Sequence, residues 1–519
     1  MSFSSLPVDV LILVFESLNV DDLSSLAQTC RVVHSAITEF GWSSYLYLHP
    51  RQSYSLSAAK RGWQPRTIAR YDAKSDLSWD TQAFIARPLS RTWSGKHQPV
   101  VVITPSRLVV GAGNHIYSYA FGHARYASVA PPVSFEGSAS LQDHPERPRN
   151  ITALVSIEDG DKNCTFDIAF QDGAIERIYL NPSRPNASRL PSTPELSITR
   201  YRLPEMPASD FVESLSSQAD IVLALSSNGS ARLTNTSFTS PTHEIDIRSR
   251  SWTSYLSLSS STPYAAFGTA STTPLTVHPI FEGGELSPLP SAILHSKKML
   301  AGELPLADKL PSSAVYGLSK GPPNAQWGSS PQILVSGWYD GKVRVYDLRV
   351  PSITSCRYTT NRAPSPLSPN SETTNASTTI NQTHIIPIHT PILSLVDRWS
   401  YEPIYSVSSG GGSASHIAAG TARHSVVSFW DIRKPATGWS VHAPGNDPSP
   451  VYSVILESSR FFGVTQSRPF VYDFGPGVSL DTYPSLPLIR GFDNLKQKKG
   501  TNQATYHVLR YTHSTSGIY

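Results

Sequence analysis

The residues that could carry out covalent or metal chemistry lack the spacing that such chemistry requires. Cys30, Cys164 and Cys356 are far apart and form no Cys-x-x-Cys pair, so the sequence encodes neither a local zinc site nor a disulfide framework. The 16 histidines include no His-x-x-x-His pair beside a carboxylate. The glycine run at 410–412 could cradle a phosphate, but no Lys-Ser or Lys-Thr follows it. We therefore expect no catalytic residue, metal or cofactor, and a catalytic set assembled from distant positions is the alternative that spacing leaves open.

Length and composition indicate several domains or a repeat architecture rich in turns. The chain has 519 residues, whereas a single non-repetitive core usually stops growing at roughly 250–300 residues. Its 42 prolines, 31 glycines and 16% charged residues favour many short strands joined by turns. The formal net charge of +4, with scattered basic residues, gives no support for nucleic-acid binding. No apolar stretch approaches the roughly 18 residues of a membrane helix, so we expect no membrane segment and an intracellular location, cytoplasmic and/or nuclear.

Residues 1–48 predict a small all-α domain of three helices. Apolar residues recur at three- and four-residue steps in the first helix, behind a proline that suits a first turn: Pro7, Val10, Leu11, Val14, Phe15 and Leu18. Asp21 and Asp22 can cap a second helix, which continues through Leu23 and Leu26. So short a bundle buries little area, yet its first helix is apolar on most of its circumference. The surplus predicts a docking face for a partner protein.

The same residues carry a resemblance to a known family. Leu6-Pro7-Val8-Asp9-Val10-Leu11, then 14–18, 22–31 and Trp42 resemble the F-box motif throughout and in order. The resemblance implies that the helices bind a Skp-type adaptor, which in turn holds a cullin and the ubiquitin-conjugating machinery. The side chains expected at that contact are Leu6, Pro7, Val10, Leu11, Val14, Phe15, Leu18, Leu23 and Leu26. Leu11→Asp with Phe15→Asp is then expected to abolish adaptor binding; the alternative interpretation is a plain helical cap.

From residue 99 to residue 475 the pattern changes to the period of two that is typical of strands. Residues 333–349 and 417–433 resemble WD repeats, the first with an Asp340-Gly341 hairpin turn and the second with Trp430-Asp431. Five weaker copies predict an all-β propeller of about seven blades. In WD repeats a Ser, a turn Asp and a strand aromatic form a buried hydrogen-bond network. Ser336, Asp340 and Tyr346 are expected to form it, and Trp430 and Asp431 to be structural.

The predicted organisation is therefore multidomain, with a three-helix F-box followed by a β-propeller. Residues 49–98 are expected to be a connector that packs between the domains, and 476–519 a C-terminal tail. Within the propeller, 359–383 consists mostly of Ser, Thr, Asn and Pro, and we expect a disordered loop between blades.

The function that this organisation implies is that of a non-catalytic substrate receptor in a Skp–cullin–F-box ubiquitin ligase. Propeller loops would hold a protein target, and basic side chains among them would favour a phosphorylated one. Arg248, Arg250, Arg344 and Arg423 are the candidates for such contacts. Two alternatives stay open: a non-degradative scaffold for complex assembly, and an enzyme built on a propeller with a helical cap.

Overall fold

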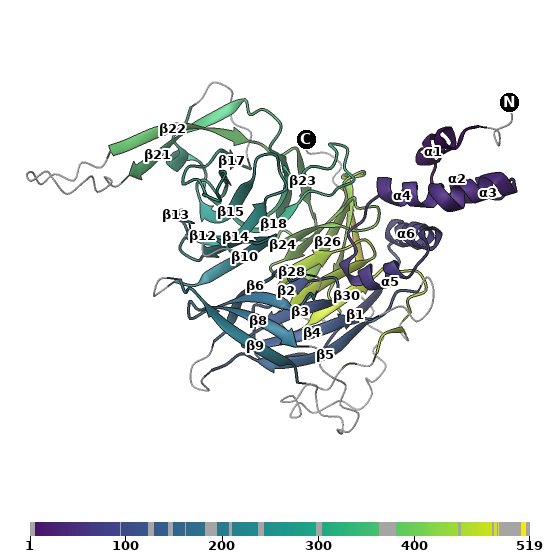
Figure 1. Cartoon of the computed structure of the whole chain (residues 1–519). Helices are drawn as coiled ribbons and strands as arrows, with labels where there is room; N and C mark the ends of the chain where they lie inside the picture. The colour runs from purple at the N-terminus through teal and green to yellow at the C-terminus, as the bar shows by residue number, and fades with distance from the viewer. Residues whose placement is uncertain are drawn as a thin grey trace, which may run out of the picture.

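The computed structural model places a helical N-terminal region at one end of a large β domain (Figure 1). It describes residues 6–514 except 94, 123–128, 144–148, 161, 182–194, 207–209, 237–242, 297–303, 363–379, 445–447, 480–481, 485 and 487–509. The central part of the predicted 359–383 loop and most of the tail therefore lie outside the described residues.

The N-terminal region has more helical segments than the sequence predicts. Its elements are α1 (Val8–Glu16), α2 (Val20–Leu26), α3 (Arg31–Ala36), the π-helical turn η2 (Ile37–Gly41) and α4 (Trp42–Leu48). Asn19 caps α2, because its side-chain oxygen accepts hydrogen bonds from the backbone N–H groups of Asp21 and Asp22, each at 2.9 Å. The helices enclose a small core around Phe15, Leu23 and Trp42.

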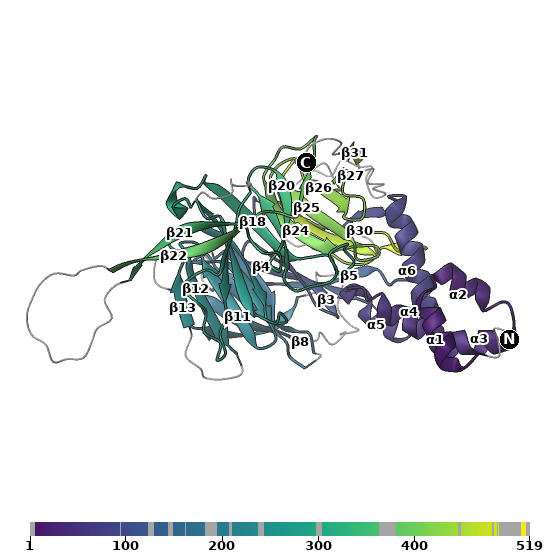
Figure 2. The ribbon, with the colours of Figure 1, turned by 90° about the horizontal axis from the view of Figure 1, so that it is seen from above.

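The connector is ordered along most of its length and includes one strand of the β domain. It contains η3 (Tyr54–Leu56), α5 (Ser57–Arg61), the long helix α6 (Pro65–Asp80) and β1 (Ile85–Pro88). Pro65 is the first residue of α6, where its missing N–H costs no helical hydrogen bond. Seen from above, α6 links the first helices to the β domain (Figure 2).

The β domain consists of hydrogen-bonded sheets arranged around a centre. One four-stranded sheet contains β1, β28 (Val451–Leu456), β29 (Arg460–Thr465) and β30 (Pro469–Asp473). The second contains β2 (Val100–Ile103), β3 (Arg107–Ala112), β4 (His115–Phe121) and β5 (Val133–Ser140). The third contains β6 (Ile151–Ser156), β7 (Thr165–Phe170), β8 (Ile175–Asn181) and β9 (Ser197–Leu203). The fourth contains β10 (Val212–Gln218), β11 (Ile221–Ser226), β12 (Ser230–Asn235) and β13 (His243–Asp246).

Two larger sheets complete the domain. The five-stranded sheet contains β24 (Ile404–Gly410), β25 (His416–Thr421), β26 (Val426–Asp431), β27 (Thr437–His442) and β31 (Arg510–Ser514). The ten-stranded sheet begins with β14 (Ser251–Ser257), β15 (Tyr264–Ser271), β16 (Leu275–Pro279) and β17 (Ala292–Leu294). It continues with β18 (Ser313–Lys320), β19 (Ile333–Trp338), β20 (Lys342–Asp347) and β23 (Leu393–Val396). Its last members form a hairpin of β21 (Thr354–Arg362) and β22 (Ile380–His389). The short helix η4 (Ala307–Lys309) contacts β21.

The prediction of about seven blades needs correction. Five sheets have the four or five strands of a single blade, and the other ten strands form one continuous sheet. The fusion arises where the end of β15 bonds to the start of β18 through two residue pairs, Ala270 with Ala314 and Ser271 with Ser313. The structure thus has a propeller-like arrangement with five separate blades and one composite sheet.

Strands from outside the predicted 99–475 segment take part in the domain. β1 pairs antiparallel with β30, so a strand of the connector completes the sheet that the last strands of the domain begin. In the tail, β31 adds a fifth strand to the edge of β27. The strands β21 and β22 occupy both ends of the segment predicted as a loop, and their hairpin projects from the side of the domain away from the N-terminal helices (Figure 2).

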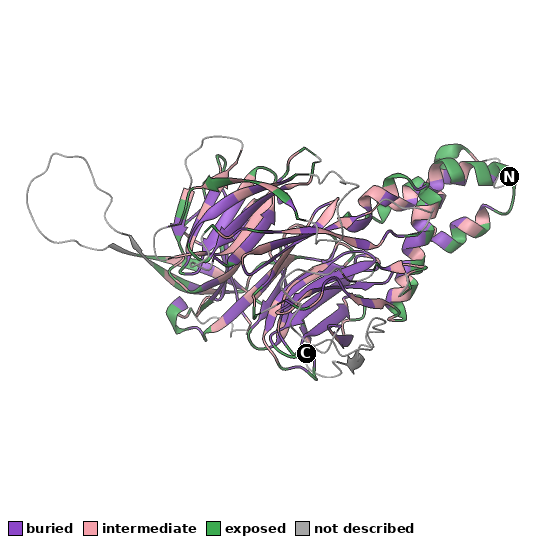
Figure 3. Cartoon of the chain, turned by 90° about the horizontal axis from the view of Figure 1, so that it is seen from below, coloured by how far each residue is buried: buried purple, intermediate pink, exposed green. Residues whose placement is uncertain are grey.

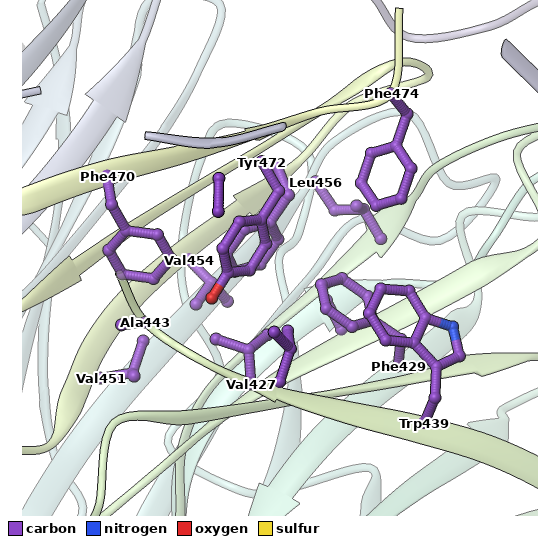
Figure 4. Packing of buried hydrophobic residues seen from close by; sticks show 14 of the residues in the cluster. Val427, Phe429, Trp439, Ala443, Val451, Val454, Leu456, Phe470, Tyr472 and Phe474 are labelled. Atoms are coloured by element: carbon purple, nitrogen blue, oxygen red, sulfur yellow. The ribbon is translucent and has the colours of Figure 1, made fainter. Parts of the chain in front are cut away.

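The core lies mainly between adjacent sheets. Burial is concentrated in the strands around the centre, whereas the N-terminal helices and the projecting hairpin carry most of their residues exposed or half-buried (Figure 3). One cluster packs Val427, Phe429 and Trp439 against Val454, Phe470 and Tyr472 of the neighbouring sheet (Figure 4). Trp79 of α6 belongs to the same cluster, so the connector shares a core with the β domain.

Candidate functional site

The side chains predicted to contact an adaptor divide between a core and a surface. Leu11, Phe15 and Leu23 are almost completely buried, and they hold α1 and α2 against Val33, Ile37 and Trp42. Leu6, Leu18 and Leu26 are partly buried at the margin of this core. Leu11→Asp with Phe15→Asp would therefore place two charges in the core and unfold the helices, so this pair does not test adaptor binding by itself.

An exposed apolar face remains on the first helix. Val10, Leu13 and Val14 are three and four residues apart in α1 and so share one side of it, and Pro7 precedes them at the N-cap. Val10 is 40% exposed and Leu13 is 66% exposed, whereas Val14 is half-buried. We call these four residues the α1 face. Leu13 was missed by the sequence analysis, because it is not one of the residues that carry the resemblance.

The helical region is fixed to the β domain by Trp79. Its indole Nε1 donates a 2.8 Å hydrogen bond to the carbonyl oxygen of Ser458, and its ring stacks on Phe474 with centroids 3.6 Å apart. The ring also lies over the turn at 410–412, where Gly411 and Gly412 have φ angles of +67° and +52°. A Cβ at either glycine would stand 3.2–3.3 Å from the Trp79 ring. The glycine run is thus a packing site for the connector.

Polar contacts reinforce this junction. Arg51 donates to both carboxylate oxygens of Asp76 and to the carbonyl oxygen of Gly412, at 3.1 Å. The backbone N–H and the hydroxyl of Ser55 both donate to the buried carboxylate of Glu457. Burial raises the pKa of Glu457 to about 6. Two hydrogen-bonded anchors and one aromatic anchor therefore set the orientation of the helices on the domain.

The residues of the WD-like hairpin make contacts that differ from those predicted. Asp340 accepts two hydrogen bonds from the guanidinium of Arg344, rather than bonding with Ser336 or Tyr346. Ser336 accepts a 2.8 Å hydrogen bond from the indole of Trp338, and Tyr346 donates one of 3.1 Å to the carbonyl oxygen of His295. The cause is Arg344, whose guanidinium occupies the position beside Asp340 and covers the Trp338 ring at 4.7 Å.

The Trp-Asp pair at 430–431 lies at the end of β26. Trp430 is 1% exposed and belongs to the core between neighbouring sheets. Asp431 accepts a hydrogen bond of 3.0 Å from the backbone N–H of Arg433 and pairs with its guanidinium. Asp347 makes the same two contacts with Arg349 at the end of β20. Both aspartates thus stabilise the turn that follows their strand.

The four arginines proposed for a phosphorylated target have different environments. Arg344 is 3% exposed and paired with Asp340, so it belongs to the interior. Arg250 pairs with Glu213 at 3.1 Å, and Arg248 pairs with Asp246 at 3.5 Å. Arg423 is exposed, and its backbone N–H donates to Glu402. The structure does not gather their guanidinium groups into one cluster.

A cavity of about 510 Å³ lies where seven strands meet, and we call it the central cavity. The strands that line it are β2, β6, β10, β14, β18, β24 and β28. Six of them have a β-bulge at the equivalent position near the strand start, and each bulged residue lines the cavity. These residues, which we call the bulge ring, are Thr152, Glu213, Trp252, Tyr316, Tyr405 and Tyr452. A bulge takes one residue out of the ladder and redirects its side chain, which explains why all six face the same space.

The aromatic members of the bulge ring form a continuous arc. The centroids of Trp252 and Tyr316 are 5.1 Å apart, those of Tyr316 and Tyr405 5.3 Å, and those of Tyr405 and Tyr452 5.9 Å. The guanidinium of Arg250 lies 4.4 Å from the Trp252 ring. Burial raises the pKa of Glu213, which opposes its negative charge, while Arg250 favours that charge. The sequence analysis missed this arc, because its members are spread over 201 positions of the chain, from 252 to 452.

One serine motif that the sequence analysis overlooked lies beside this cavity. Residues 317–321 read Gly-Leu-Ser-Lys-Gly, which has the spacing of a nucleophile turn. Ser319 lies within β18, however, and a nucleophile turn requires a sharp bend from a strand into a helix. Among the described residues, no three His, Cys, Asp or Glu side chains lie together as a metal would require. Nor does any helix in the described part of the chain combine the length and apolar character of a membrane span.

Comparisons with known proteins agree with the geometry of the helical region. Residues 3–45 match the family described as F-box-like, a range that includes α1, α2, α3 and the start of α4. No curated protein matches the chain. Among solved structures it is similar to the computationally designed Ika8 protein, with 13% identity and a TM-score of 0.40 over 75% of this chain and 99% of that chain. The WD-repeat resemblance stays a prediction. The chain has an F-box-like domain at residues 3–45, followed by an all-β domain with a propeller-like arrangement.

Proposed function

We propose that this chain is the substrate receptor of a Skp–cullin–F-box ubiquitin ligase. In this proposal the α1 face binds a Skp-type adaptor, which connects the chain to a cullin, and the β domain binds the protein to be ubiquitinated. The chain itself forms no covalent intermediate. It contributes by proximity, because a bound target has a high effective concentration near the conjugating enzyme.

The observation that carries the proposal is the apolar α1 face on an F-box-like domain that is fixed to a propeller-like domain. Val10 and Leu13 are large apolar residues exposed side by side, although three neighbouring leucine and phenylalanine side chains fill the core. A partner that covers this face would gain the free energy of removing it from water. The Trp79 junction would hold the target at a constant place relative to that partner.

The test is a substitution that changes the α1 face and spares the core. Val10→Asp with Leu13→Asp should reduce binding of a purified Skp-type adaptor by at least about 100-fold, because burial of each side chain contributes roughly 1.5–3 kcal/mol. Leu77→Asp is the matched control, since Leu77 in α6 is 63% exposed, close to the 66% of Leu13, and lies outside residues 3–45.

Calorimetric titration of the adaptor into each full-length variant measures this effect, and thermal unfolding checks that each is folded. If the Val10/Leu13 variant binds as tightly as the Leu77 variant, the α1 face is not the adaptor site and the receptor proposal fails.

A non-degradative scaffold would show the same adaptor binding. The two functions differ in the fate of the target. Depletion of the chain from cells should lengthen the half-life of proteins held by the β domain if it is a receptor, and leave those half-lives unchanged if it is a scaffold.

A further inference from the structure

We propose that the central cavity binds a lysine or arginine side chain presented by an extended segment of the target protein. The inference rests on the proposed function, because it names the chemistry of the segment that the β domain would hold.

The described lining of the cavity contains one acidic side chain and no basic one. Glu213 is the one carboxylate among the lining residues that the structure describes, and these include no Lys, Arg or His. Its side chain is 19% exposed, so water screens it only in part. Arg250 pairs with this carboxylate at 3.1 Å and balances much of its charge, so the carboxylate alone attracts a second cation only weakly.

The aromatic arc supplies the second attraction. Aromatic rings attract cations to their faces, and tryptophan and tyrosine do so strongly. The structure contains one example at this site, since the guanidinium of Arg250 lies over Trp252 and pairs with Glu213. Tyr316, Tyr405 and Tyr452 continue the arc beyond Trp252 and line the cavity. A second cation can therefore approach the rings of these tyrosines.

Size and hydrogen-bonding groups fit a peptide better than an isolated ion. At about 510 Å³ the cavity is in the range of sites that enclose small organic ligands. The hydroxyl groups of Ser214 and Ser216, which line the cavity, already bond Ser254 of β14. The hydroxyl of Thr152 has no partner among the described residues and can bond a peptide backbone. The bulge ring lies near the start of β24 and β28, whereas the connector contacts the turns at the far end of the same strands, at Gly412 and Ser458. A target segment in the ring would not compete with the helical junction.

The experiment uses the immobilised full chain and four pools of random nonapeptides. The pools differ only at a fixed central residue, which is lysine, arginine, norleucine or phosphoserine, and retained peptide is measured by mass spectrometry. Norleucine has nearly the length of lysine without its charge. We expect the lysine and arginine pools to be retained at least about five-fold more than the norleucine pool.

Variants locate the preference in the cavity. Tyr405→Leu removes the ring that contacts both Tyr316 and Tyr452, and should bring the lysine-to-norleucine ratio below about two. Tyr405→Phe keeps the ring and should keep the ratio. Tyr201→Leu, on the outer strand β9, is the matched control and should also keep it. If Tyr405→Leu does not fold, Glu213→Gln replaces it, since the loss of the carboxylate leaves Arg250 to repel a second cation.

Three results would overturn the inference: equal retention of the lysine and norleucine pools, preferred retention of phosphoserine, or an unchanged preference in folded Tyr405→Leu. Adaptor binding has no part in this assay. A failure here therefore leaves the receptor proposal standing. If instead the adaptor does not bind the chain but the lysine preference is retained, the receptor proposal fails and the peptide site stands.

Discussion

The carboxylate of Glu457 is a single group whose charge affects the junction between the two parts of the molecule. It is 1% exposed and accepts hydrogen bonds from Ser55 in the connector. Burial raises its pKa from the ordinary 4.5 to about 6, although the Ser55 donors act in the other direction. The folded protein therefore binds this proton more tightly than the unfolded chain does. The stabilising contribution is complete below pH 4.5 and is lost as the pH rises through about 6.

Glu457→Gln should remove this pH dependence. Between pH 4.5 and pH 7 the free energy of unfolding of the wild type should fall by about 2 kcal/mol relative to the variant, which follows from the size of the pKa change. Denaturant unfolding of both proteins at the two pH values measures the difference, and Glu16→Gln on exposed α1 is the control. A difference between wild type and Glu457→Gln that stays constant across this range would contradict the assignment.

Single residues were predictable where the contact is local. The turn between β19 and β20 lies where it was predicted, with Gly341 at a φ of +77°. It is longer than the predicted two-residue turn, because the last paired residues are Gly337 and Val343, and Asp340 does not have a positive φ. The partners of Asp340 were not predictable. Arg344 is four residues away, but whether its guanidinium turns toward Asp340 depends on Trp338 and on the packing of the neighbouring sheet.

The strand β1 shows what a short element can decide. Four residues, 85–88, supply the outer edge of the sheet formed by β28, β29 and β30, and Ala86 belongs to the core shared with the adjacent sheet. We predicted these residues to be part of the connector, because four residues are too few to show the alternation of apolar and polar side chains that marks a strand. Their partner is also nearly at the other end of the chain, which a local pattern cannot reveal.

Two truncations test the role of β1. Removal of residues 1–48 should leave a folded β domain, because Trp79 and β1 remain. Removal of residues 1–95 should expose the edge of β30 together with apolar side chains of the core, so the product should aggregate or lose its cooperative thermal transition. Circular dichroism and size-exclusion chromatography distinguish the two. A monomeric 1–95 deletion that unfolds at the same temperature as the 1–48 deletion would show that β1 is dispensable.

At the scale of the whole molecule, the order of domains was predictable and their attachment was not. The helical period of residues 1–48 and the strand period after residue 99 differ in any window of the sequence, so the boundary could be found. The attachment depends on Trp79 meeting Gly411 and Gly412, which come from two parts of the chain that sequence spacing does not relate.

Trp79→Ala should therefore loosen the orientation of the helices while leaving adaptor binding intact. Spin labels on the exposed thiol of Cys30 and on Tyr201→Cys, with Cys164→Ser, report the distance between the two parts by pulsed electron resonance. We expect one narrow distance distribution in the otherwise unaltered protein and a broad one with Trp79→Ala. Leu77→Ala, on the exposed side of the same helix, is the control and should keep the narrow distribution. A narrow distribution in both variants would show that Arg51 and Ser55 suffice to fix the junction.

The pairing of β1 with β30 also affects how the chain folds during its synthesis. About 380 residues separate the two strands, which corresponds to roughly 20–75 s of synthesis at 5–20 residues per second. The N-terminal helices can fold as soon as they emerge, while β1 waits without its partner until β30 has been made. During that interval its edge is open to pairing with other nascent chains, as is every sheet already formed beside it. The sheet that β1 shares with β30 is therefore completed only after more than 380 further residues have been made.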